Sequence, residues 1–211
     1  MATRASDSFS KNVFINCPFD PAYLSLLRPL LFTIIYLGFN PRIASESSDS
    51  LEQRIEKILK LIKECRYSIH DLSRIKSEKE KEFYRLNMPF ELGMDYGCRR
   101  ISGNRLKLKK SLILENKPRD IKHGLSDLAG VDVKSHGNNP VKIPEVVQHW
   151  FIETVGIVDA DSPSRIWDRF NVFTFDFYER RKAQGYLKGE LKIMPIPQYT
   201  RSIRNWIASN P

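Results

Sequence analysis

Residues 12–45 read NVFINCPFDPAYLSLLRPLLFTIIYLGFNPRIAS, and this stretch is the most informative about the fold class. Residues 12–17 form a short apolar run that is typical of a buried strand. Residues 21–38 predict a helix, because Pro21 suits a first helical turn and Gly38 suits the position after the last one. Residues 41–45 predict a second short strand. A strand, a helix and a strand in this order indicate a parallel βαβ unit.

The same alternation continues to about residue 154. We expect further strands over 67–72, 111–115 and 131–135, and helices over 50–65, 89–99, 121–129 and 144–154. The charged segment 76–84 is expected to form a loop. Five strands separated by helices predict an α/β protein with a flavodoxin-like, doubly wound, five-stranded parallel sheet.

A change in composition at about residue 156 marks a C-terminal region without strand patterns. Ser162 and Pro163 form a typical helix start there. An apolar stripe at helical spacing follows, formed by Ile166, Phe170, Phe173 and Phe177. We therefore expect a flexible N-terminus over residues 1–11, an α/β domain over 12–155 and a helical C-terminal extension over 156–211. The stripe is expected to pack on the α/β domain or on a second copy of the chain, so a homo-oligomer through the C-terminal helices is the expected assembly.

Charge and cysteine content restrict the partners and the compartment. The 211 residues include 34 basic and 25 acidic side chains, a formal net charge of +9, which favours anionic partners such as nucleotides or nucleic acids. Three cysteines without a CxxC pair argue against disulfides and zinc, and fit a reducing cytoplasm. The start of the chain is polar, so no signal peptide is expected, and no apolar run is long enough to predict a membrane span.

Several standard catalytic motifs are missing from the sequence. It contains no GxxxxGK[ST] loop, no GxGxxG turn, no GxSxG elbow and no HExxH pair. In open α/β sheets, ligands bind beyond the carboxyl ends of the strands. The segments expected there are 16–20, 45–48, 71–73 and 87–91, and we expect them to converge on one crevice. His70 lies inside a predicted strand and is expected to be a core residue.

Glu91 is the sharpest catalytic candidate. Pro89 is expected to be the first helical residue, which places Glu91 in the first turn, where the helix dipole favours an ionised carboxylate. Such a carboxylate suits cleavage of a glycosidic bond, in which positive charge develops on the sugar. The alternative is that Glu91 is a capping-box residue that bonds back to the first amide of the helix.

Three motifs together resemble a known family. FINCPFD at 14–20, ECRYSIHDLSR at 64–74 and RLNMPFELGMDYG at 85–97 resemble the bacterial TIR-like (Toll/interleukin-1 receptor-like) proteins and the related nucleoside 2-deoxyribosyltransferases. The resemblance covers roughly residues 12–154 and implies a flavodoxin-like fold. It also implies that Glu91 is the catalytic glutamate of an Asn-x-x-x-Glu-hydrophobic-Gly helix. The serine-rich first loop and the proline-containing loop after the second strand of common TIR domains have no counterpart here.

The resemblance implies hydrolysis of NAD to nicotinamide and ADP-ribose or a cyclic form, in bacterial defence or signalling. NAD would be the substrate, with no cofactor and no metal. Glu91 would contact the ribose, Asn87 would bond a hydroxyl from one turn earlier, and Asp71 would orient the ribose or the attacking water. The alternative for Asp71 is a turn residue.

Further substrate contacts are expected from Asn16, Phe19, Asp20, Glu46 and Ser73. Asn16 would donate to phosphate or sugar, and Phe19 would stack on a base. The alternatives are that Asn16 closes the end of its strand, that Phe19 is a core residue and that Glu46 is a solvated charge. Arg42 and Arg74 would pair with a diphosphate, or remain surface charges.

Other functions remain open at this point. One is a non-enzymatic TIR-like module for nucleotide sensing or assembly, with Glu91 as a helix cap. Another is a nucleoside deoxyribosyltransferase. Nucleic-acid binding through the basic segment 105–110 would rest on charge alone.

Overall fold

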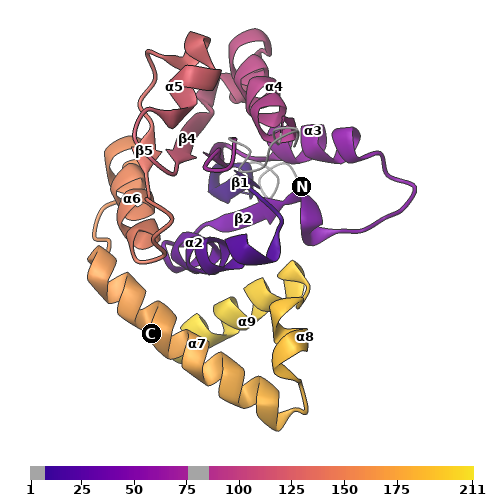
Figure 1. The fold of residues 1–211 in the computed structure, drawn as a ribbon, viewed down its shortest axis with the longest axis vertical. Helices are drawn as coiled ribbons and strands as arrows, with labels where there is room; N and C mark the ends of the chain where they lie inside the picture. The colour runs from indigo at the N-terminus through magenta and orange to yellow at the C-terminus, as the bar shows by residue number, and fades with distance from the viewer. Residues whose placement is uncertain (1–7, 76–85) are drawn as a thin grey trace. The chain divides into compact units, whose positions relative to one another are not determined.

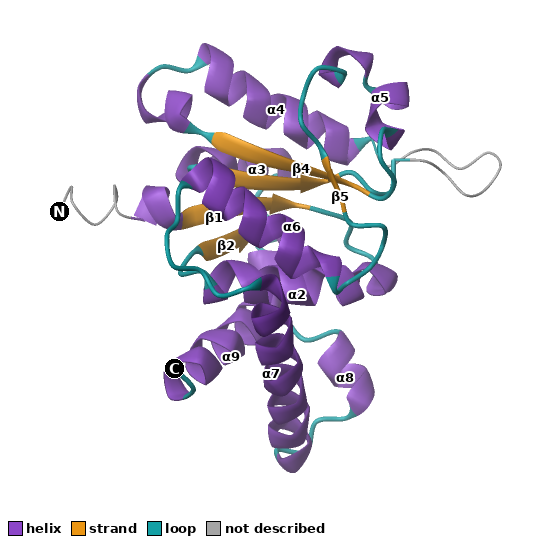
Figure 2. Ribbon diagram, turned by 90° about the vertical axis from the view of Figure 1, so that its left-hand side faces the viewer, coloured by secondary structure: helices purple, strands orange, loops and turns teal. Residues whose placement is uncertain are grey.

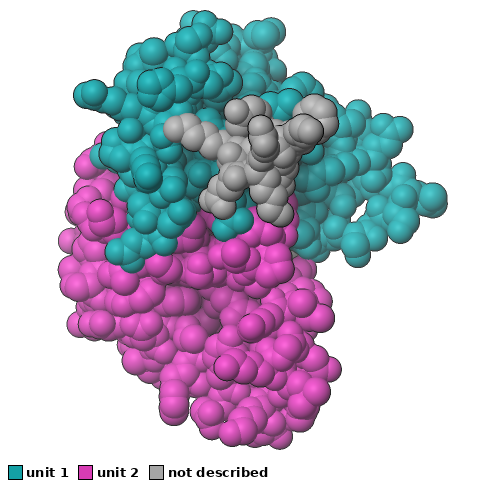
Figure 3. All heavy atoms as spheres, in the orientation of Figure 1, with its two compact units in different colours: residues 1–18, 40–139 teal, residues 19–39, 140–211 magenta. Residues whose placement is uncertain are grey.

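The computed structural model describes residues 8–75 and 86–211. The charged loop expected at 76–84 lies outside these residues, and so do residues 1–7 of the expected flexible N-terminus. Residues 8–11 form a helical turn. The chain divides into two compact units, one made of Met1–Pro18 and Asn40–Asn139, the other of Phe19–Phe39 and Pro140–Pro211 (Figure 3).

The first unit holds one five-stranded, all-parallel sheet (Figures 1 and 2). Its strands are β1 (Asn12–Asn16), β2 (Asn40–Ile43), β3 (Tyr67–Asp71), β4 (Lys110–Glu115) and β5 (Lys134–Ser135). The order β2-β1-β3-β4-β5 is that of the flavodoxin-like fold, so the predicted fold class is confirmed. The strand order reverses between β1 and β3, where Asn16 lies opposite His70. This switch point is where such sheets bind ligands.

Two long helices of the first unit pack on this sheet. They are α3 (Arg54–Glu64) and α4 (Asn87–Ile101). Phe14 of β1 is buried with Ile58 and Ile62 of α3, and Met94 and Cys98 of α4 pack against the same cluster. The shorter helical segments of the unit are η2 (Ala44–Glu46), η3 (Asn104–Leu108), α5 (Asp120–Gly124) and η4 (Ser126–Leu128).

The second unit is helical. It contains η1 (Pro21–Tyr23), α2 (Leu24–Tyr36), α6 (Lys142–Trp150), the π-helical turn η5 (Phe151–Val155), α7 (Pro163–Ala183), α8 (Lys188–Lys192) and α9 (Ile196–Ser209). Ser162 caps α7, as predicted, by accepting the N–H of Arg165. The predicted apolar stripe of α7 is buried, and its Phe173 stacks on Phe32 of α2 with ring centroids 5.5 Å apart. The C-terminal helices therefore share a core with α2.

Several predicted boundaries are wrong. The helix expected over 50–65 begins only at Arg54, and Leu51, which precedes it, is 95 % exposed. The last strand has two residues instead of five, because Val131 and Val133 pack against a side-chain cluster before the ladder begins. Helix α8 had no expected counterpart. Within the described residues, no helix combines the length and the apolar character needed to cross a membrane.

Candidate active site

Helix α4 begins two residues earlier than predicted. Its first residue is Asn87, so Pro89 is the third residue and Glu91 the fifth. Proline is tolerated at the third position because the N–H groups of the first turn have no partner within the helix. The residue before the helix, Leu86, makes no side-chain capping hydrogen bond, and Glu91 lies two positions beyond the third helical residue that a capping box uses. The capping-box alternative for Glu91 is therefore wrong, and so is its placement in the first turn.

Burial governs the charge of Glu91. The residue is 4 % exposed, and burial raises the pKa of its carboxyl group. Arg54, the first residue of α3, opposes this shift, because its Nη2 lies 3.4 Å from Glu91 Oε1. The Arg54 side chain is 57 % exposed, whereas that of Glu91 is 6 % exposed. A buried carboxylate is thus paired with a cation at the protein surface.

Glu91 and Arg54 line a cavity of about 180 Å³ between α3 and α4. Asn87 lines the same cavity, as expected from its position one turn before Glu91 on the same face of α4. Phe90 adds an aromatic ring that is 60 % exposed. Ile55 and Ile58 complete the lining. The cavity therefore combines a carboxylate, an amide, a guanidinium group and an aromatic ring.

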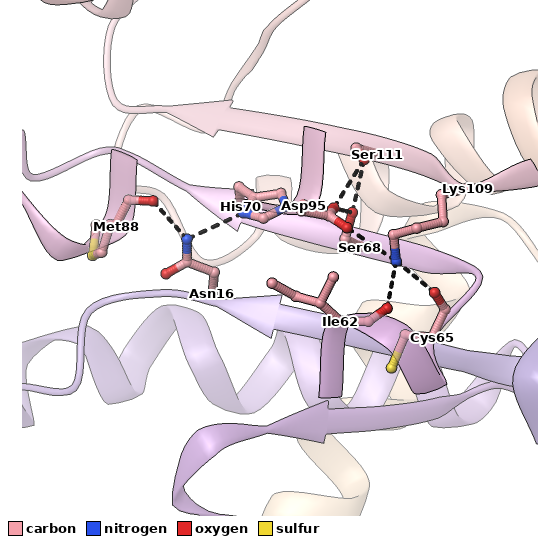
Figure 4. Close-up of polar contacts among 9 residues, drawn as sticks. All are labelled: Asn16, Ile62, Cys65, Ser68, His70, Met88, Asp95, Lys109 and Ser111. Carbon is pink, nitrogen blue, oxygen red and sulfur yellow. Dashed lines mark hydrogen bonds and ion pairs between the residues drawn. The ribbon is translucent and has the colours of Figure 1, made fainter. Parts of the chain in front are cut away.

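A buried hydrogen-bond network fixes the start of α4 at the switch point (Figure 4). Asn16 Nδ2 donates to the carbonyl oxygen of Met88, at 2.8 Å, and lies 3.1 Å from His70 Nδ1. Because the amide donates to Nδ1, His70 carries its proton on Nε2. Both N–H donors of Asn16 are therefore used inside the protein, which agrees with the alternative that Asn16 closes the strand end.

The same network continues from His70 to Asp95, one turn after Glu91 on α4. His70 Nε2 donates to Asp95 Oδ2 at 3.0 Å, and Ser68 Oγ donates to the same oxygen at 2.5 Å. Lys109 Nζ lies 3.0 Å from Asp95 Oδ1. Burial alone would raise the pKa of Asp95, but the hydrogen bond from His70 and the charge of Lys109 hold it well below its usual range.

Lys109 is fully buried at the far end of this network. Its Nζ donates to the carbonyl oxygens of Ile62 and Cys65, in addition to its ion pair with Asp95. Lys109 belongs to the basic segment that was considered for nucleic-acid binding. It is not a surface charge, although Arg105 and Lys107 of that segment are exposed.

The other predicted site residues do not line the cavity. Asp71 is fully buried, accepts the N–H of Ser73 at 2.9 Å and lies 3.1 Å from His136 Nε2. A side-chain oxygen that accepts the N–H two residues later is typical of an Asp in a turn, so the contact with Ser73 agrees with the alternative that Asp71 is a turn residue. Ser73 Oγ has no hydrogen-bond partner among the described residues.

Glu46 and Arg42 bind each other. Arg42 Nη2 lies 2.7 Å from Glu46 Oε1, and a second oxygen of Glu46 accepts the N–H of Ile43. Arg42 also pairs with Glu64 at 3.1 Å. These contacts tie β2 to the segment after it and to the end of α3.

Phe19 and Asp20 belong to the second unit. Asp20 accepts the N–H of Tyr23 at 3.0 Å and so caps η1. Phe19 is 45 % exposed.

Sequence reasoning did not identify Arg54, Asp95 or Lys109 as part of this region. It placed Phe90 there, within the segment 87–91, but gave its ring no role. The spacing of Asp95 gives one usable signal, because Asn87, Glu91 and Asp95 recur every four residues and so share one face of a helix. Arg54 and Lys109 come from distant parts of the chain, and no local pattern connects them to α4.

Comparisons with known proteins add no assignment. Neither the scan against protein-family models nor the searches of curated proteins and of solved structures found a match. Among residues 8–75 and 86–211, no group of three His, Cys, Asp or Glu side chains is arranged to hold a metal ion.

Proposed function

We propose that this protein cleaves the N-glycosidic bond of a nucleotide, with NAD as the best candidate substrate and Glu91 as the catalytic carboxylate. The observation that supports the proposal most is the buried Glu91 carboxylate in a cavity that also holds Arg54 and Asn87. Stability alone does not favour this arrangement, because burial disfavours the charged carboxylate. Residues whose pKa values are shifted by burial in a cleft are frequent in active sites.

The chemistry needs a negative charge beside the sugar. When the bond between ribose C1′ and the nicotinamide nitrogen breaks, its electron pair moves to that nitrogen, and nicotinamide leaves as a neutral molecule. Positive charge develops on C1′ and the ring oxygen, where the Glu91 carboxylate stabilises it. A water molecule then adds to C1′ and loses a proton. The surroundings of Glu91 strengthen its effect, because electrostatic interactions are stronger in a site of low dielectric constant.

The remaining cavity residues have matching roles. Asn87 would bond a ribose hydroxyl, Arg54 would pair with a phosphate, and the exposed ring of Phe90 would stack on a base. The cavity of about 180 Å³ is smaller than the roughly 300–1,000 Å³ of a typical ligand site. We therefore assign it to the ring system around the scissile bond, with the remainder of the dinucleotide outside it.

The test is release of nicotinamide from NAD by the wild-type chain, by Glu91→Gln and by Glu56→Gln. The amide in Glu91→Gln keeps the shape of the side chain and removes its charge. Glu56 is an exposed glutamate of α3 and provides the same substitution outside the cavity. We expect turnover by the wild type and by Glu56→Gln, and a loss of about 10²–10³-fold in Glu91→Gln.

The same experiment separates the alternatives. Equal turnover in all three proteins would place the chemistry elsewhere. Base exchange between 2′-deoxynucleosides without hydrolysis of NAD would replace the proposal by a nucleoside deoxyribosyltransferase. If no nucleotide or nucleoside is consumed at high protein concentration, the proposal fails in favour of a sensing or assembly module.

A further inference from the structure

A second cavity lies within the helical unit, between α7 and α9. Its volume is about 170 Å³. Three aromatic residues line it, Phe173 and Phe177 of α7 and Trp206 of α9, and each is at most 5 % exposed. The rings of Phe173 and Trp206 meet edge to face with centroids 5.8 Å apart. These packed rings form a fixed apolar surface.

Neighbouring side chains hold the guanidinium group of Arg181 in place at this cavity. Its Nη1 donates to Gln184 Oε1 at 2.9 Å, and its Nη2 donates to Ser202 Oγ at 2.9 Å. The guanidinium carbon lies 5.7 Å from the centre of the Phe177 ring and 5.5 Å from that of Tyr186. A guanidinium group has five N–H donors, so these two hydrogen bonds leave donors for a ligand. Because the side chain is already ordered, binding would cost little additional entropy.

Neither of the two arginines that line this cavity has a carboxylate partner among the described residues. Arg181 is held by neutral groups, and Arg180 is exposed beside it. The helix dipole explains why basic residues occur in the last turn of α7. It does not explain why one guanidinium group is held by Ser202 of α9 beside the buried Phe177 ring.

We propose that this cavity binds a small organic anion that combines a flat ring with a phosphate or carboxylate group. The ring would lie against Phe177 and Trp206, and the anionic group would accept hydrogen bonds from Arg180 and Arg181. Arginine suits such groups because its planar fork matches two of their oxygens. A single six-membered ring with one anionic substituent fits the volume of the cavity. This site is independent of Glu91, so it stands whether or not the proposed glycosidase activity is found.

Isothermal titration calorimetry with phenyl phosphate tests the site. Inorganic phosphate and phenol, which each carry one half of phenyl phosphate, are titrated for comparison. We expect saturable 1:1 binding of phenyl phosphate with a Kd of about 1 mM or lower, at least tenfold tighter than either partial ligand. Benzoate in place of phenyl phosphate shows whether a carboxylate serves equally well. Binding should weaken as salt increases, because the anion pairs with arginine.

Matched variants locate the binding. Arg181→Gln and Arg180→Gln should each weaken binding of phenyl phosphate at least tenfold. Arg180 is exposed, so its replacement leaves the packing intact. Arg201 is an exposed arginine of α9 that does not line the cavity, and Arg201→Gln should bind as the wild type does. The proposal is overturned by an absence of saturable binding, by equal binding of inorganic phosphate and phenyl phosphate, or by equal effects of Arg180→Gln and Arg201→Gln.

Discussion

Replacement of Lys109 by methionine tests the buried network beneath the candidate active site. Methionine fills a similar volume but removes the charge. Lys109 Nζ contacts Asp95 Oδ1 at 3.0 Å and two backbone carbonyl oxygens, so the variant leaves a buried carboxylate without its cation and two acceptors without a donor. Removal of one partner from a buried ion pair costs about 3–5 kcal/mol. With a urea m-value of about 2 kcal/mol/M, the unfolding midpoint should fall by about 2 M.

The assay must report on the unit that holds the sheet. Trp150, Trp167 and Trp206 all belong to the helical unit, so tryptophan fluorescence reports directly on that unit and not on the sheet. Hydrogen exchange of the β1 and β3 amides in increasing urea follows unfolding of the sheet. The control is Lys107→Met, two residues away and exposed, which should change stability by less than about 0.5 kcal/mol. A loss below about 1 kcal/mol in Lys109→Met would refute the structural role of the network.

Three further predictions concern other parts of the chain. Folding lowers the pKa of Asp95, so the ionised carboxylate stabilises the protein at pH values above its unfolded pKa of about 3.9, and this stabilisation is lost as the pH falls further. The difference in unfolding free energy between the wild type and Asp95→Asn, measured by urea unfolding, should therefore shrink below pH 4. A difference that stays constant with pH would contradict this. Phe173→Ala should destabilise the helical unit by about 3–5 kcal/mol, measured by tryptophan fluorescence, because the ring is 1 % exposed and packs on Phe32. The expected homo-oligomer would use apolar residues of α7 such as Phe175, which is 68 % exposed. Phe175→Asp should then lower the mass measured by light scattering to that of one chain. An oligomer mass that does not change would exclude this surface.

The fold could be predicted because its signals are local. The strands β1, β3 and β4 each contain a short buried run, and each long helix carries either an apolar stripe or a typical start such as Ser162–Pro163. The start of α4 was misplaced for an equally local reason. Helical backbone angles are disfavoured for the residue before a proline. Tertiary contacts override this preference at Met88, because its side chain is buried and its carbonyl oxygen accepts a hydrogen bond from Asn16. Short elements such as β5 have too few residues to give a periodic signal.

The candidate site could be predicted only in part. The spacing along one helix was sufficient to place Asn87 and Glu91 together. The cation beside Glu91 comes from the start of α3, and the cation beside Asp95 comes from the end of η3, so neither pair leaves a pattern in the local sequence. The sign of the pKa shift of Glu91 also depends on burial, which the helix-dipole argument did not include.

Stability should separate a catalytic Glu91 from a structural one. Folding raises the pKa of Glu91, so above that pKa the buried charge lowers stability, and protonation at lower pH removes the penalty. Glu91→Gln should therefore be at least as stable as the wild type at pH 7, measured by urea unfolding. A large loss of stability would indicate a structural role.

The role of Glu91 in cleaving the N-glycosidic bond is tested by the rate of nicotinamide release from NAD at pH 7, compared between the wild type and Glu91→Gln. We expect measurable release by the wild type and a fall of about 10²–10³-fold in a Glu91→Gln protein that remains folded. Release at equal rates by the two proteins would contradict this role.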